Sequence, residues 1–179
     1  MKEYVSDLYD KIKGESSGLG NLLAKVPGLG GYMERGRRRE ADQILRDTIS
    51  GHLEASRLTL SSVHQELGRD IIKAMDFAEP LGRADNMLMG LIGKIKDAPQ
   101  GYAGFFDAVK VKEDDLARLY AFDESMLNHV DEVDASIEAL QTAVRDDGDI
   151  NSTIRRLTTV LQTANQDFAN RNEVLMGIN

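Results

Sequence analysis

The spacing of apolar residues in the C-terminal part of the chain restricts the fold more than any other feature. Between Lys112 and Arg145, apolar side chains recur at steps of three and four residues. They are Leu119, Met126, Val130, Val133, Ile137, Leu140 and Val144, and the position between Leu119 and Met126 is occupied by Asp123. An average step of about 3.5 residues is the period of a coiled coil. The final segment repeats this pattern at Ile150, Ile154, Leu157, Leu161, Ala164, Phe168 and Leu175. Because Asp146 to Asp149 supplies a short acidic turn, with Asp149 as N-cap, the two segments are predicted to pair as an antiparallel hairpin.

The preceding part of the chain also carries helical periodicity. A long helix is expected from about Met33 to Leu67, and Gly68 is expected to end or bend it. The prediction rests on apolar residues that are mostly three or four apart: Ala41, Leu45, Ile49, Leu53, Leu60, Val63 and Leu67. A second stretch covers 69–79 and is expected to be interrupted at Pro80 and Gly82 by a kink or a turn. The stripe from Ala84 to Ile95 then forms a further helix, closed by Pro99. The fold class is therefore predicted to be all-α, an elongated antiparallel helical bundle of three to five helices with a C-terminal coiled-coil-like helical hairpin.

Two glycine-containing segments lie outside this periodicity. Residues 1–32 are predicted to form a short amphipathic helix over about 2–13 followed by a glycine-rich connector, and residues 33–179 a single helical-bundle domain. Residues 101–111 are apolar but irregular, and they include Tyr102, Phe105 and Phe106. We predict that this aromatic segment plugs one end of the bundle. If it is exposed instead, these three side chains would form a partner-docking surface.

Composition excludes several functional classes. The 179 residues carry a formal net charge of −8, which opposes binding to the phosphates of nucleic acid. There is no cysteine, so disulfides and thiolate metal sites are excluded. No run approaches the roughly 20 apolar residues that span a bilayer, and the first residues lack the apolar run of a secretory signal. A cytoplasmic or membrane-peripheral location is expected.

Motifs that would support catalysis or metal binding are not found. The three histidines, His52, His64 and His129, have neither the Glu-x-x-His pairing of di-iron bundles nor the His-Glu-x-x-His of zincins, and we expect them on helix surfaces or boundaries. The acidic turn before Ile150 fails the calcium-loop pattern, and neighbouring carboxylates in sequence do not share a helix face. The sequence predicts a protein that is not an enzyme and has no catalytic, cofactor or metal residue.

One basic cluster could contact an anionic surface. Four arginines follow the apolar stretch that ends at Met33, namely Arg35, Arg37, Arg38 and Arg39. Such a segment can lie on anionic lipid. However, Glu34, Glu40 and Asp42 flank the arginines and are expected to neutralise much of their field, so a solvated helix start is the alternative.

Two stretches carry a family resemblance. One is Lys25-Val26-Pro27-Gly28 with Gly31-Tyr32 and residues 38–42, and the other is residues 101–112 followed by Leu116, Leu119, Tyr120, Phe122 and Asp123. Together they are similar to an uncharacterised bacterial family of small helical proteins, over most of the chain after residue 20. The resemblance implies no activity, cofactor or catalytic residue. An association of such proteins with membrane-scaffold operons adds slightly to the membrane hypothesis.

These observations lead to two main functional hypotheses. The first is a non-enzymatic protein–protein interaction or scaffold protein, whose partners are other proteins or a second copy bound through the heptad faces. The alternative is a peripheral membrane-associated module that contacts anionic lipid or a membrane scaffold through residues 1–39. A third, an enzyme or a metal-binding bundle, requires carboxylates from different helices to converge in the core, and the sequence spacing gives no sign of that.

Overall fold

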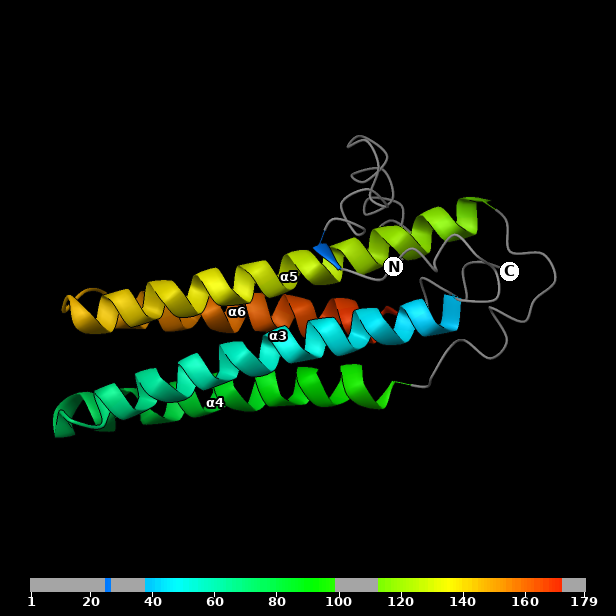
Figure 1. Cartoon of the computed structure of the whole chain (residues 1–179). Helices are drawn as coiled ribbons and strands as arrows, with labels where there is room; N and C mark the ends of the chain where they lie inside the picture. Colours follow the sequence, from blue (N-terminus) through cyan, green and yellow to red (C-terminus); the bar gives the residue numbers. More distant parts are fainter. Residues whose placement is uncertain (1–24, 27–37, 99–112, 172–179) are drawn as a thin grey trace. The chain divides into compact units, whose positions relative to one another are not determined.

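A computed structural model describes residues 25–26, 38–98 and 113–171, and these residues contain helices and no strand (Figure 1). The helices are α3 (Arg38–Leu67), α4 (Ile71–Asp97), α5 (Glu113–Arg145) and α6 (Ile150–Ala169). The predicted all-α helical bundle with a C-terminal helical hairpin is confirmed. The predicted helix over 2–13, the domain boundary at residue 32 and the aromatic segment 101–111 lie outside the described residues.

The chain divides into two compact units. The second unit consists of Ile49–Asp97 and Asn128–Phe168, so it holds all of α4, most of α6 and the C-terminal parts of α3 and α5. The described part of the first unit holds the N-terminal parts of α3 and α5 and the residues that directly follow α4 and α6.

The second unit is a four-helix bundle. Side-chain contacts join each pair of neighbouring helices, and they include Arg57 to Asp85, Ser56 to Asp134, Asn165 to the carbonyl of Met87, and His129 to Asp167. These contacts place α3 beside α4 and α5, and α6 beside α4 and α5. Figure 1 shows that each hairpin, α3–α4 and α5–α6, is antiparallel, whereas the α3–α5 and α4–α6 neighbours run parallel.

The core of this unit contains the apolar residues that the sequence periodicity selects. On α5 and α6 the heptad residues are buried at Val130, Val133, Ile137, Leu140, Val144, Ile150, Ile154, Leu157, Leu161 and Ala164. Each large side chain of this kind contributes about 1.5–3 kcal/mol when it is fully removed from water. The predicted hairpin therefore forms because its apolar stripes are covered by α3 and α4 as well as by each other.

The turn predicted at Pro80 and Gly82 is wrong, and the alternative, a kink, stays a prediction. Helix α4 continues through both Pro80 and Gly82. Proline removes one intrahelical hydrogen bond, from the carbonyl of Asp76, which lies at an exposed position where water can replace the donor. The residues that follow, Leu81 and Ala84, are completely buried, so core packing holds the helix together across the proline.

The helix ends are formed by local hydrogen bonds that the sequence predicts in part. Gly68 donates its backbone N–H to the carbonyl of His64 and follows the last residue of α3, as expected. Asp70 then caps α4, accepting hydrogen bonds from the backbone N–H groups of Ile72 (2.9 Å) and Lys73 (3.2 Å). Asp149 caps α6 in the predicted manner, through the N–H of Ser152 at 2.9 Å.

Candidate functional site

Most of the site residues that the sequence suggests lie outside the described residues. This applies to the docking candidates Tyr102, Phe105 and Phe106 and to the basic residues Arg35 and Arg37. Arg38 and Arg39 are the first two residues of α3, and their side chains also lie outside the described part. Both hypotheses about these residues remain predictions.

A buried ionic cluster occurs in the first unit. The Asp42 carboxylate accepts a hydrogen bond from Arg46 Nε at 3.1 Å and from Arg171 Nη2 at 2.7 Å, and none of the three side chains is more than 7% exposed. Arg46 also donates to the carbonyl of Ala98 at 2.7 Å, just beyond the end of α4, and to Gln43 at 2.9 Å. Paired donors and acceptors of this kind hold these three positions of the chain together.

Asp42 was predicted to neutralise the arginines at 35–39, whose side chains lie outside the described residues, so this stays a prediction. Among the described residues its partners are Arg46 and Arg171. A signal for this pairing exists in the sequence, because Asp42 and Arg46 are four residues apart on one helix face. The periodicity analysis counted only apolar residues and therefore overlooked it.

His129 forms a second buried polar cluster, in the second unit. Its Nε2 lies 2.7 Å from Oδ2 of Asp167 on α6, and its Nδ1 lies 3.3 Å from Oε2 of Glu132 on α5. His129 and Asp167 are 9% and 8% exposed. The expectation of surface or boundary histidines is therefore wrong for His129, which follows the buried Met126 by one helical turn and meets α6 there.

The electrostatic environment favours the charged imidazolium form of His129. Burial is the largest single effect and acts to lower the pKa, but the hydrogen bonds and charges of Asp167 and Glu132 together raise the pKa above its ordinary value. Each ring nitrogen faces a carboxylate oxygen, so both nitrogens can donate a hydrogen bond when the ring is protonated.

The part of the chain that the structure describes contains no group of three or more His, Cys, Asp or Glu side chains that could hold a metal ion. Within the same residues, no helix combines the length and the hydropathy needed to cross a bilayer.

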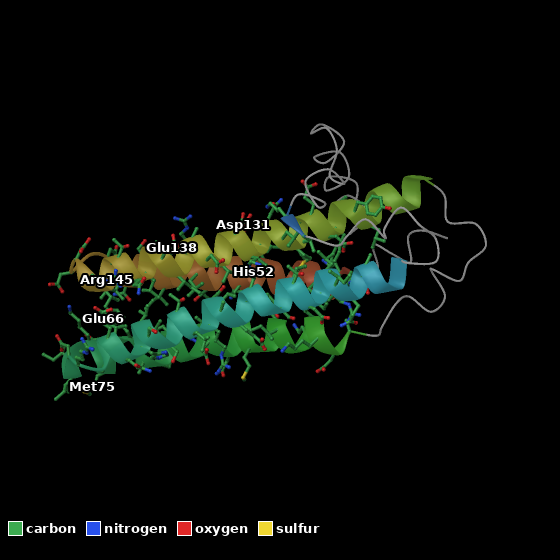
Figure 2. The ribbon with its side chains drawn as sticks, in the orientation of Figure 1. His52, Glu66, Met75, Asp131, Glu138 and Arg145 are labelled. Atoms are coloured by element: carbon green, nitrogen blue, oxygen red, sulfur yellow. The ribbon has the colours of Figure 1, made fainter. Side chains whose placement is uncertain are left out.

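Three large apolar side chains are exposed at the start of α4. Ile71, Ile72 and Met75 are 77%, 74% and 78% exposed, and their spacing brings them together on the first two helical turns. We call these three residues the corner patch; Figure 2 labels Met75 at this end of the second unit. The ion pair between Lys73 and Asp147 places the patch next to the turn between α5 and α6.

A surface groove runs along the α3–α4 hairpin in the second unit. It has a volume of about 640 Å³, and we call it the hairpin groove, lined by Glu54, Arg57, Leu58, Ser61, His64, Asp85, Met89, Ile92, Gly93 and Lys96. Arg57 and Asp85 form a bidentate pair across it, at 2.8 and 3.0 Å. This pairing raises the pKa of Arg57 and holds the pKa of the Asp85 carboxyl below its ordinary value, although partial burial of Asp85 opposes the shift.

No family model, no curated protein and no solved structure matches the chain. The function must therefore be argued from the surfaces and the buried clusters described above.

Proposed function

We propose that the chain is a non-enzymatic interaction or scaffold protein that binds a protein partner through the corner patch. The observation that supports this most is the exposure of Ile71, Ile72 and Met75, because clustered apolar side chains left in water are typical of contact surfaces. Covering each of them would stabilise a complex by about 1–2 kcal/mol, given the fraction already exposed. The two buried polar clusters support the non-enzymatic part, since their donors and acceptors are paired within the chain.

The charges around the corner patch indicate the character of the partner. Acidic residues outnumber basic ones in the two adjoining turns: Asp70, Asp76, Asp146, Asp147 and Asp149 against Arg69, Lys73 and Arg145. An acidic rim repels anionic lipid and attracts basic side chains. The partner we propose is therefore a cytoplasmic protein that presents apolar side chains within a basic surface.

Site-specific photo-crosslinking in the native host would test this proposal. A photoreactive residue at position 72 should give a discrete adduct with a protein, whereas the same residue at the exposed position Gln162 on α6 should not. Replacing Ile71 and Met75 with Gln should remove the adduct without lowering the urea midpoint, because both side chains are already exposed. Equal labelling from positions 72 and 162 would refute the proposal.

A second candidate function is peripheral membrane binding through residues 1–39. The burial of Asp42 favours it, because the charge of this acid is shared with Arg46 and Arg171, two cations outside the basic cluster. Vesicle co-sedimentation separates the two functions. The full chain should pellet with vesicles of anionic phospholipid and not with zwitterionic vesicles, and changing the four arginines at 35, 37, 38 and 39 to Gln should release it. If the protein stays in the supernatant with both vesicle types, the membrane hypothesis is refuted, and the proposal for the corner patch is not affected.

A further inference from the structure

The hairpin groove has two exposed apolar side chains, Leu58 and Met89, and two ion pairs in its lining. Leu58 on α3 is 73% exposed and Met89 on α4 is 49% exposed, so both side chains present a large apolar area to water. Beside them α4 carries Gly90 and Gly93, and no atom lies within 4 Å of the position that a Cβ would take at either glycine. A helix that packs against this face would contact apolar side chains and, at the two glycines, could approach the backbone of α4 closely.

The two ion pairs have opposite polarity across the groove. In one, the cation belongs to α3 and the anion to α4, as Arg57 and Asp85. In the other, the anion belongs to α3 and the cation to α4, as Glu54 and Lys96. The charged ends of each pair touch, so these ends lie at similar levels. The backbone positions do not coincide, because Glu54 and Arg57 are three residues apart on α3 whereas Asp85 and Lys96 are eleven residues apart on α4. Each helix therefore presents both signs of charge, and each charge has its opposite directly across the groove.

We propose that the hairpin groove binds a second copy of this chain about a twofold axis parallel to α3 and α4. Rotation about that axis lays α3 of one copy along α4 of the other, and these two helices then run antiparallel. Leu58 meets the partner's Met89, Arg57 meets the partner's Asp85, and Glu54 meets the partner's Lys96. Each of these three contacts across the axis joins apolar to apolar or opposite charges, as a self-complementary interface requires.

The size of the face predicts a weak dimer. The part of α3 in the second unit, residues 49–67, rises about 28 Å, and two helices side by side are about 20 Å wide. The face thus offers roughly 550 Å² per copy, and the total of about 1,100 Å² is near the lower limit for a specific interface. This surface differs from the heptad faces, whose residues in the second unit are covered by the chain's own helices. The proposal does not depend on the corner patch.

Sedimentation velocity from about 1 to about 500 μM tests the proposal, since interfaces of this size give dissociation constants in the micromolar range or weaker. The wild-type chain should shift from monomer to dimer. Leu58→Glu and Met89→Glu should each weaken dimerisation at least about tenfold, because each places two new acids in the contact. Met75→Glu is the matched control: an equally exposed residue outside the groove that should leave the dimerisation constant unchanged.

A charge-reversed variant tests the geometry itself. The double variant Arg57→Glu with Asp85→Arg keeps the ion pair within each chain, so the hairpin contact is retained. It also keeps opposite charges across the proposed axis, and the variant should dimerise as tightly as the wild type. In a mixed dimer, Glu at position 57 would face the wild-type Asp85 and Arg at position 85 the wild-type Arg57. Native mass spectrometry of a tagged mixture should therefore show mixed dimers reduced at least about tenfold.

Several results would overturn the proposal. A monomer at every concentration, unchanged dimerisation in Leu58→Glu and Met89→Glu, or loss of self-association in the charge-reversed variant would each do so. Statistical mixing of wild-type and charge-reversed chains would show that the axis does not pair Arg57 with Asp85. A binding partner of different sequence that occupies the groove and keeps the chain monomeric would also count against it.

Discussion

The pairing of His129 with Asp167 gives a stability prediction whose sign and size follow from the structure. Replacing His129 with Leu removes the imidazolium from a carboxylate 2.7 Å away that is only 8% exposed. Breaking a buried ion pair by deleting one partner costs about 3–5 kcal/mol, and a hydrogen bond between charged groups contributes about 1.5–3 kcal/mol. Both sites retain some exposure to water, so we expect His129→Leu to lower the free energy of unfolding by about 3 kcal/mol.

The same contact predicts how the stability depends on pH. The folded-state pKa of His129 is raised above its ordinary value of about 6.5, which the unfolded chain keeps. Stabilisation by the charged pair is therefore fully present below about pH 6.5, and it is lost as the pH rises through the folded-state pKa. The difference in unfolding free energy between wild type and His129→Leu should be largest near pH 6 and should shrink toward pH 9.

Urea unfolding of four proteins measures these effects: the wild type, His129→Leu, Asp167→Leu and the double variant. The double variant should be less destabilised than the sum of the two single variants by about 2–3 kcal/mol, because it leaves neither charge without its partner. Titration of the ring by NMR supplies an independent value of the pKa. A ring pKa below 6.5, or additive effects of the two substitutions, would refute the argument.

Three further substitutions test the packing described above by urea unfolding. Asp42→Ala should lower the free energy of unfolding by about 3–5 kcal/mol because it deprives two buried guanidinium groups of their shared carboxylate, and a loss below about 1 kcal/mol would contradict that role. Asp149→Ala should cost about 1 kcal/mol through loss of the N-cap bond to Ser152, with Asp149→Ser retaining most of it. Pro80→Ala should stabilise the chain by about 1–3 kcal/mol, since α4 continues through this position, and destabilisation would show that the proline ring supplies essential packing.

The regular part of the fold could be predicted from the sequence because one physical signal determines it. Apolar residues on α5 and α6 recur at the helical period, and the core of the second unit contains these residues. Asp149 could also be predicted as an N-cap, because a short polar side chain directly before an apolar stripe can accept a hydrogen bond from the first backbone N–H groups of a helix. Such signals are local, and they do not depend on which helices become neighbours.

The errors arose where the outcome depends on tertiary contacts. Pro80 is unfavourable in an isolated helix, but the burial of Leu81 and Ala84 offsets its cost. His129 has no carboxylate three residues before it, and its partner Asp167 lies 38 residues away on another helix. The predicted antiparallel hairpin places the two residues at similar distances from its turn at 146–149. A search for motifs within one helix does not compare positions on two helices, so the pair was missed.

The exposed apolar residues require a different argument from the buried ones. A core residue such as Leu140 is explained by its helix period, whereas Leu58, Ile71 and Ile72 contribute nothing to the core and are still large and apolar. A bundle of this kind folds as well with Gln or Lys at such positions, because both are good helix formers. The fold therefore does not require apolar side chains at these positions, and contact with another molecule would explain them. The functional proposals for the corner patch and the hairpin groove rest on this argument. Substitutions at Ile71 and Met75 test the corner patch, and substitutions at Leu58 and Met89 test the hairpin groove.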